Sequence, residues 1–361
     1  MKIISIYTKT GARAATSYYR VYQYLKGVDA VIKKRKMLSD GLYKRLMPIS
    51  RQPIHIKIFT FLIIYIRVLS QLARDSICPP TCLIISRRLI NRIMPLLYKF
   101  LLKRIKQSGT KIIWDFDDEI IESKEVSRKT FDFLSEIADV IIVASPYNKA
   151  MVGVENSHKV QILSTTDGDM FKYFNYDVVE KRALVLDKQV RIIWLGTSVS
   201  LKYVLKICDK FEILAKKLEQ PVVLTIVSDK SLNYIPLNFK LRNIQWSRDV
   251  ALQEALNSHL GIMPLDVNSF TKGKGGFKLI QYLSVGLPVV ATGVGINNDI
   301  VSSDVGKLVD NLESMDWCNA IYDIIKNKNL WINYSKNAFY KWSENYNYSK
   351  NLKIWNSLLM N

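Results

Sequence analysis

Cysteine and histidine are scarce in this sequence. Its 361 residues include four cysteines and three histidines, too few for a disulfide framework in a chain of this length. The one close pair, Cys78 and Cys82, has no second pair that would complete a structural zinc site. The sequence therefore predicts a reduced, cytoplasmic protein.

Long apolar runs are also absent. The most apolar stretch, residues 58–66, is nine residues long and lies between Lys57 and Arg67, whereas a bilayer span takes roughly 20 residues. Residues 1–7 are too short an apolar segment for the core of a signal peptide. We therefore expect neither a targeting segment nor a helix that crosses a membrane.

Acidic residues are almost missing from the first third of the chain. Residues 1–110 contain 22 basic and 3 acidic side chains, whereas residues 111–361 contain 30 and 29, so nearly all of the net charge of +20 lies in the first third. Such a region faces an anionic partner. The composition as a whole, 48% apolar and 23% charged, is that of a globular protein and excludes a disordered one.

Short β-branched runs alternate with helical patterns, which is typical of parallel α/β architecture. We expect strands at residues 3–7, 30–33, 83–86, 111–115, 140–144, 160–164, 191–196, 222–228, 260–264 and 288–292. We expect helices at residues 17–26, 54–73, 88–106, 129–137, 201–218, 250–257 and 276–285.

The strand rhythm is interrupted near residues 165–190, which indicates two domains. We expect two doubly wound, Rossmann-like parallel-sheet domains, at residues 1–167 and 168–340, that face a central cleft at the carboxyl ends of their strands. A helical tail at residues 341–361 is expected to cross back toward the first domain.

The most informative motif is a basic, glycine-rich loop, K-G-K-G-G-F-K, at residues 272–278. Glycines let the backbone approach a ligand, and the helix that follows presents N–H groups to an anion. Lys274 and Lys278 add positive charge where the helix dipole disfavours it, which indicates a phosphate between them. A solvated basic loop is the alternative.

A second turn of this kind follows the strand at residues 191–196. Gly196, Thr197, Ser198 and Lys202 offer a close backbone approach, hydroxyls and a positive charge, which suits a phosphate. Many ordinary strand-to-helix turns look the same.

Three aspartates, Asp115, Asp117 and Asp118, gather at the end of the strand at residues 111–115. Carboxylates so close together repel one another unless a cation or a hydrogen-bond donor is near. Metal binding, binding of sugar hydroxyls with a role as base, and capping of the next segment all remain open.

The first strand leads into a turn and helix with Gly11, Arg13 and Arg20, but without the complete G-x-G-x-x-G fingerprint. This disfavours a nicotinamide-dependent enzyme. Both arginines are expected at or near the cleft.

These segments together resemble a known family. Residues 261–292, with residues 191–203, 114–119 and 17–25, resemble the retaining, GT-B-fold glycosyltransferases of family four, often called glycosyl transferases group 1. The specific part is residues 273–290, which match the pattern G-K-x-G-[FY]-K-L-x-Q-Y-x-x-x-G-L-P-V-V of a bacterial branch.

The resemblance implies a nucleotide sugar bound mainly by the second domain and an acceptor bound mainly by the first. We assign catalytic roles in stabilising the departing diphosphate and activating the acceptor to Lys274, Lys278, Asp117, Asp118 and Arg20. We assign the donor site to Gly11, Gly196, Thr197, Ser198, Lys202, Gly273 and Gln281. Gly273 and Gln281 stand where the wider family has the two glutamates of an E-x7-E pair. A UDP- or GDP-linked donor, no cofactor and no metal are implied.

The basic first third predicts a membrane partner. We assign acceptor or membrane contacts to Arg13, Arg87, Lys33, Lys34, Arg35 and Lys36. Basic clusters beside the apolar helix at residues 54–73 suit an anionic leaflet. The alternative is a core helix with a solvated basic face, and nucleic acid is disfavoured because no motif of that class is present.

The sequence therefore predicts a peripheral enzyme on the inner face of the cell membrane. It would transfer a hexose with retention from a nucleotide sugar to a lipid-linked acceptor in the synthesis of a surface polysaccharide or lipopolysaccharide. An inverting transferase or a sugar-nucleotide epimerase is one alternative, and a non-catalytic protein that binds membrane or nucleic acid is another.

Overall fold

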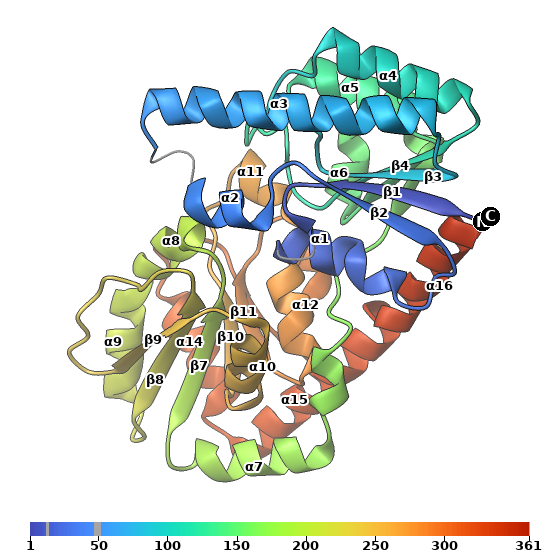
Figure 1. Ribbon diagram of the computed structural model, residues 1–361. Helices are drawn as coiled ribbons and strands as arrows, with labels where there is room; N and C mark the ends of the chain where they lie inside the picture. The colour runs from blue at the N-terminus through green and yellow to red at the C-terminus, as the bar shows by residue number, and fades with distance from the viewer. Residues whose placement is uncertain (12–13, 47–51, 361) are drawn as a thin grey trace. The chain divides into compact units, whose positions relative to one another are not determined.

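The computed structural model describes residues 1–11, 14–46 and 52–360, which divide into two compact units. Unit 1 comprises Met1–Ser164, Gly273–Gly275 and Ser349–Asn361, and unit 2 comprises Thr165–Lys272 and Gly276–Tyr348. Each unit contains one six-stranded sheet in which all the strands are parallel (Figure 1). The predicted doubly wound α/β class is therefore confirmed.

The sheet of unit 1 has the strand order β2-β1-β3-β4-β5-β6. Its strands are β1 (Ile3–Thr8), β2 (Val31–Lys36), β3 (Cys82–Ser86), β4 (Lys111–Phe116), β5 (Val140–Val143) and β6 (Val160–Ile162). The central strands β3 and β4 are almost wholly buried, as expected of parallel strands covered on both faces. All six were predicted from the sequence.

The helices of unit 1 are α1 (Ala15–Arg20), α2 (Asp40–Leu46), α3 (Ile54–Ile77), α4 (Leu96–Gln107), α5 (Arg128–Ile137), α6 (Pro146–Met151) and α16 (Tyr348–Met360). Short 3₁₀ turns lie at Tyr22–Leu25 and Ser157–Lys159. α3, α4 and α5 cover one face of the sheet (Figure 1). α16 joins unit 1 by a stack of Trp355 on Tyr24 and a hydrogen bond from Lys111 Nζ to the Leu358 carbonyl.

Two helices of unit 1 differ from the sequence prediction. α4 begins at Leu96 and not near Arg88, because Arg92 has a positive φ of 59° and Pro95 disfavours helix in the residue before it. α3 continues to Ile77 and has 24 residues, so it is longer than its apolar run suggested.

The sheet of unit 2 has the order β12-β11-β10-β7-β8-β9. Its strands are β7 (Val190–Leu195), β8 (Val222–Ser228), β9 (Lys240–Gln245), β10 (Leu260–Met263), β11 (Val289–Thr292) and β12 (Gly306–Val309). Both edge strands, β9 and β12, were missed. β9 is polar and alternates between exposed and partly exposed positions, and an edge strand does not need the apolar run of a central one.

The helices of unit 2 are α7 (Tyr176–Leu186), α8 (Leu201–Leu205), α9 (Cys208–Lys217), α10 (Arg248–Leu256), α11 (Ser269–Lys272), α12 (Phe277–Ser284), α13 (Asn297–Ile300), α14 (Asp316–Ile325) and α15 (Lys328–Asn345). Short 3₁₀ turns lie at Met170–Tyr173 and Ser198–Ser200. The single helix expected at residues 201–218 is wrong: it is two helices, separated where Ile207 leaves helical geometry at φ −111° and ψ 7°.

Candidate functional site

The turn that follows β7 lies against Lys278. A Cβ placed on Gly196 would be 2.6 Å from the ring of Trp194 and 2.8 Å from Cε of Lys278. Lys278 stands in the first turn of α12, and its Nζ is 5.6 Å from the centroid of the Trp194 ring. Unit 2 thus brings Lys278 of the glycine-rich motif to the Gly196 turn, although the two lie about 80 residues apart in the sequence.

The same turn is held by an aspartate that the sequence interpretation missed. The backbone N–H and the hydroxyl of Ser198 donate to the carboxylate of Asp229, over 2.6 and 2.9 Å. Burial alone would raise the pKa of Asp229, but the bonds from Ser198 lower it below its ordinary value. A carboxylate directly after β8, at the same sheet edge, was the available signal.

α12 begins with glycine geometry. Gly276 has φ +65°, in the left-handed region, and any side chain there would overlap Ile300. Only glycine adopts this conformation at low cost. The start of α12 therefore carries the positive end of a helix dipole together with the ammonium of Lys278.

The segment that carries Lys274, Gly273–Gly275, packs within unit 1. The amide of Asn148 donates to the Gly273 carbonyl over 3.1 Å, and a Cβ on Gly273 would overlap the side chain of Glu119. A Cβ on Gly275 would be 2.8 Å from the carbonyl oxygen of Asp117. Both glycines permit this close approach, which places the partly buried Lys274 beside residues 117–119.

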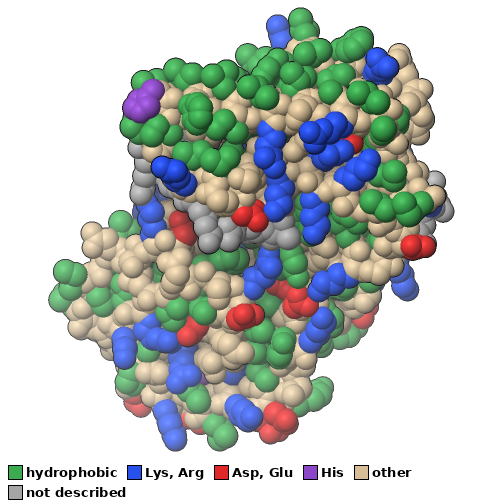
Figure 2. Space-filling view, viewed as in Figure 1, with side chains coloured by type: hydrophobic (Ala, Val, Ile, Leu, Met, Phe, Trp, Pro, Cys, Tyr) green, Lys and Arg blue, Asp and Glu red, His purple; other side chains and the backbone are tan. Residues whose placement is uncertain are grey.

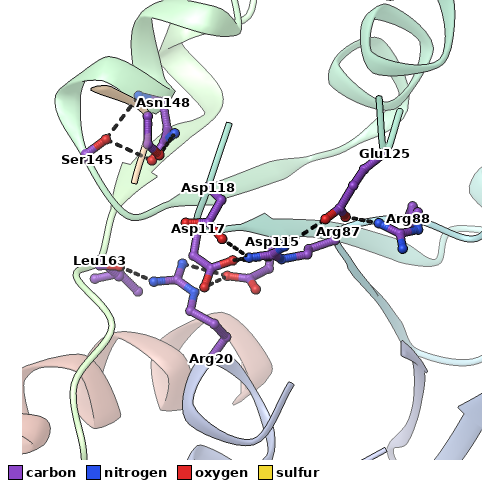
Figure 3. Close-up of polar contacts among 11 residues, drawn as sticks. Arg20, Arg87, Arg88, Asp115, Asp117, Asp118, Glu125, Ser145, Asn148 and Leu163 are labelled. Carbon is purple, nitrogen blue, oxygen red and sulfur yellow. Dashed lines mark hydrogen bonds and ion pairs between the residues drawn. The ribbon is translucent and has the colours of Figure 1, made fainter. Parts of the chain in front are cut away.

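Arg87 supplies the positive charge that offsets the repulsion predicted between the neighbouring aspartates (Figure 3). Its guanidinium contacts Asp117 over 2.6 and 2.9 Å, Glu125 over 3.1 Å, and also Asp118. Burial opposes its charge, but Asp117 and Asp118 hold the pKa of Arg87 well above its ordinary value. Arg87 has φ 62°. The sequence assigned it to acceptor or membrane contacts, whereas the structure directs its charge inward.

Arg20 is also held inside unit 1. Its Nε and Nη2 donate to Oδ1 of Asp115 over 3.0 and 2.7 Å, and its Nη1 donates to the Leu163 carbonyl (Figure 3). Both side chains are buried. Burial raises the pKa of Asp115 to about 6, against the effect of Arg20. Among the described residues, Oδ2 of Asp115 has no hydrogen-bond partner.

Gln281 is tied within unit 2. Its amide donates to Asp167 over 3.0 Å, and the same aspartate accepts backbone N–H groups from Asp169 and Met170. The side chain that replaces a family glutamate therefore fixes the chain at the start of unit 2.

The remaining predicted donor residues are divided between the two units. Lys202 is exposed, with Nζ 4.9 Å from the ring of Tyr203, and Thr197 is exposed in the turn. Gly11 has φ +67°, and its N–H donates to Thr8 Oγ1 over 2.9 Å in unit 1. Arg13 lies outside the described residues.

The predicted basic cluster lies on the edge strand β2. Lys34 stands over the ring of Tyr22 at 5.9 Å, and Lys36 binds Asp40 at 3.1 Å. Arg35 contacts the buried carboxylate of Asp75, and no bond of Lys33 is recorded within the described part of the chain. Arg35 therefore forms an ion pair with a buried carboxylate, although it stands on an edge strand.

Lys9, after β1, is a further cation that the sequence interpretation missed. Burial lowers the pKa of Lys9 to about 8, and the neighbouring Arg88 and Arg87 lower it too. Its Nζ lies 5.7 Å from the ring of Tyr43. The sequence shows Lys9 only as a lysine in a polar turn, so its burial and its proximity to Arg87 and Arg88 could not be predicted.

The comparisons with known proteins agree with this architecture. Residues 189–327 match the family model described as Glycosyl transferases group 1. This segment, which lies in unit 2 except for Gly273–Gly275, is therefore similar to the group 1 glycosyl transferases. No curated protein matches the chain in sequence.

Solved structures match the chain over nearly its full length. A sucrose-phosphate synthase from Thermosynechococcus elongatus is 13% identical with a TM-score of 0.64, over 99% of this chain and 98% of the other. Anabaena Alr3699/HepE in complex with UDP-glucose is 12% identical with a TM-score of 0.67, over 100% and 98%. A glycosyltransferase from Rickettsia africae is 14% identical with a TM-score of 0.62, over 100% and 99%. These likenesses confirm the predicted GT-B fold.

Proposed function

We propose that this protein is a hexosyltransferase that uses a nucleotide-diphosphate sugar as donor. The contact of Lys278 with the Gly196 turn carries the proposal, because it places a cation, a glycine turn and a helix start together in the unit that matches the group 1 family model. The structural neighbour from Anabaena was solved with UDP-glucose and with UDP and glucose, which supports a nucleotide sugar as donor.

The proposed chemistry follows from charge. As the sugar leaves, negative charge grows on the nucleoside diphosphate, and fixed cations aimed at that charge lower the barrier. We propose that Lys278 and the start of α12 bind the diphosphate, and that Lys274 supplies a second cation. Asp229 holds the turn in place through Ser198.

We propose that transfer needs no metal. The two lysines supply the positive charge, and the carboxylates best suited to a cation, Asp117 and Asp118, are already bound by Arg87. Among the described residues, no group of three or more His, Cys, Asp or Glu side chains is arranged to hold a metal.

For the acceptor, we propose a lipid-linked saccharide that binds unit 1. The carboxyl edge of its sheet offers Asp117 and Asp118 as hydrogen-bond acceptors for sugar hydroxyls, held by Arg87. We further propose that transfer retains the anomeric configuration. We also propose that the protein acts on the inner face of the cell membrane, in the synthesis of a surface polysaccharide or lipopolysaccharide.

A thermal-shift panel of UDP, GDP and their sugars tests the donor site. Ligand at 100 times its Kd stabilises the native state by about 2.7 kcal/mol, which raises the Tm of a unit of this size by roughly 5 to 10 °C. We expect Lys278→Ala to lose this shift and Lys216→Ala, an exposed change on α9, to keep it. No shift with any nucleotide would refute the donor assignment.

Product analysis tests the reaction. Lys274→Ala is expected to abolish transfer while its unfolding transition stays that of the wild type; unchanged turnover would contradict the role of Lys274. The anomeric configuration of the product, read by NMR, separates retention from inversion, and release of an epimerised nucleotide sugar without transfer would identify an epimerase.

A further inference from the structure

α3 turns an apolar face to solvent. Seven of its large apolar side chains are at least 46% exposed, and by helix geometry they cover an arc of roughly 160° on one side. They are Ile54, Ile58, Phe59, Phe61, Leu62, Ile66 and Ile77. Soluble proteins rarely expose a contiguous apolar patch of this kind unless it contacts a partner.

The patch continues onto α4. Three of its apolar side chains are at least 45% exposed: Leu96, Leu97 and Phe100. The two helices are joined by Tyr98, whose ring stacks on Tyr65 at 5.4 Å and whose hydroxyl donates to the Tyr65 carbonyl over 2.6 Å. Figure 2 shows hydrophobic side chains spread over the region of α3 and α4, with Lys and Arg side chains beside them. We call this surface the α3–α4 face.

α3 has the length and apolarity of a membrane span: it has 24 residues, its most apolar 18-residue window has a mean hydropathy of 1.7, and only 22% of that window is buried. Its inner side, however, is bonded to unit 1. Arg67 and Gln71 donate to the Lys36 carbonyl over 2.8 and 3.2 Å. A helix that crossed a bilayer would lose these bonds.

The buried acid of α3 fixes it further. Asp75 accepts a hydrogen bond of 2.7 Å from the hydroxyl of Tyr7 and bonds from the Arg35 guanidinium. Withdrawing Asp75 from these partners into hydrocarbon would cost the energy of an uncompensated charge. The α3–α4 face is therefore suited to lie along a membrane surface and not across it.

Charge decides between a bilayer and another protein copy. Lys57, Lys99, Lys103 and Arg104 stand on the same two helices, and the one acidic side chain of α3 and α4 is the buried Asp75. A second copy of the chain would set these cations against one another, whereas an anionic leaflet attracts them.

We propose that the α3–α4 face inserts its apolar side chains into the boundary between headgroups and acyl chains of an anionic bilayer, with both helices in the plane of the membrane. Amphipathic helices with basic residues bind membranes in this way. The inference rests on the proposed function only in that a lipid-linked acceptor would be met at this surface; binding to lipid requires no donor or transfer.

Vesicle flotation with the full chain tests the proposal. We expect the wild type to float with vesicles of phosphatidylcholine and phosphatidylglycerol, and the F59D/F61D double variant to bind them at least tenfold more weakly. The matched control is I235D/L237D, which changes two side chains of unit 2 that are 86% and 87% exposed. Equal flotation of F59D/F61D and the control would overturn the proposal, as would a wild type that stays unbound.

Two further measurements bear on the alternatives. Raising NaCl from 0.1 to 1 M shortens the screening length from about 10 to 3 Å, so part of the vesicle-bound wild type should be released. Alkaline carbonate should release the rest. Protein that stays bound after both treatments would show a spanning helix instead. A concentration-dependent dimer that F59D/F61D abolishes, without vesicle binding, would show a protein interface instead.

The donor-induced thermal shift separates this proposal from the proposed function. F59D/F61D should keep the shift of the wild type, which also shows that the variant is folded. If no nucleotide shifts even the wild type while flotation behaves as expected, the membrane face stands and the proposed function fails.

Discussion

His259 offers a prediction whose size follows from the structure. The ring is buried in unit 2; its Nδ1 accepts the N–H of Arg191 over 2.9 Å, so its Nε2 donates to the Arg182 carbonyl over 3.1 Å. The bond from Arg191 requires the neutral ring, because a protonated Nδ1 cannot accept it. Burial, together with Arg182, lowers the pKa of His259 from 6.5 to about 3.

The direction of the pH effect follows from this shift. Below pH 6.5 the unfolded chain takes up a proton at His259 that the native state does not bind, so stability is complete above pH 6.5 and is lost as the pH falls toward 3. Between pH 7.5 and 5.5, linkage of this one group costs about 1.4 kcal/mol of unfolding free energy.

Urea unfolding of the wild type and of His259→Gln at pH 7.5, 6.5 and 5.5 measures this effect. Glutamine can accept and donate hydrogen bonds but does not titrate, so the advantage of the wild type should shrink by about 1.4 kcal/mol over this range. His158→Gln, at an exposed position, is the control and should differ little from the wild type at any of the three pH values. A constant difference between His259→Gln and the wild type would refute the reasoning.

Two further predictions concern the sites themselves. Arg87→Met leaves Asp117 and Asp118 without the charge of Arg87, whereas Glu125 keeps its ion pair with Arg88. Because these side chains are only partly buried, we expect a loss of about 2 to 3 kcal/mol in urea unfolding, below the 3 to 5 typical of a buried pair. For the surface control Arg128→Met we expect a loss of less than about 1 kcal/mol. Gly196→Val adds a side chain that the Trp194 ring and Lys278 leave no room for. We expect at least tenfold weaker nucleotide binding by calorimetry with an unchanged circular dichroism spectrum, and binding equal to the wild type would contradict the assigned site.

Much of the fold could be predicted because its central strands are buried on both faces. β3, β4 and β8 are mostly apolar segments, and such segments are visible in the sequence. β9 was missed because an edge strand carries polar side chains, and the start of α4 was misplaced because a helical pattern runs through Pro95.

The site could be predicted only where a local pattern carries it. The Gly196 turn and the Lys278 helix each combine glycine with a strand end or a helix start, and parallel topology brings such ends together. The ion pairs of Arg87 and the bond from Ser198 to Asp229 join residues about 30 positions apart. Residue spacing says nothing about which side chain of several will turn inward.

The net charge of the first third of the chain is hard to interpret for the same reason: the sequence does not show which basic side chains are buried. A net charge is a sum, and the sequence does not say which of its members reach solvent. Arg20, Arg35 and Arg87 are all engaged by carboxylates of unit 1, so the proposed binding to an anionic surface depends on the other lysines and arginines of this region. Those on α3 and α4 stand beside exposed apolar side chains, and this combination distinguishes a membrane from a nucleic acid: a phosphate backbone would attract the cations but would gain nothing from Phe59 or Phe100.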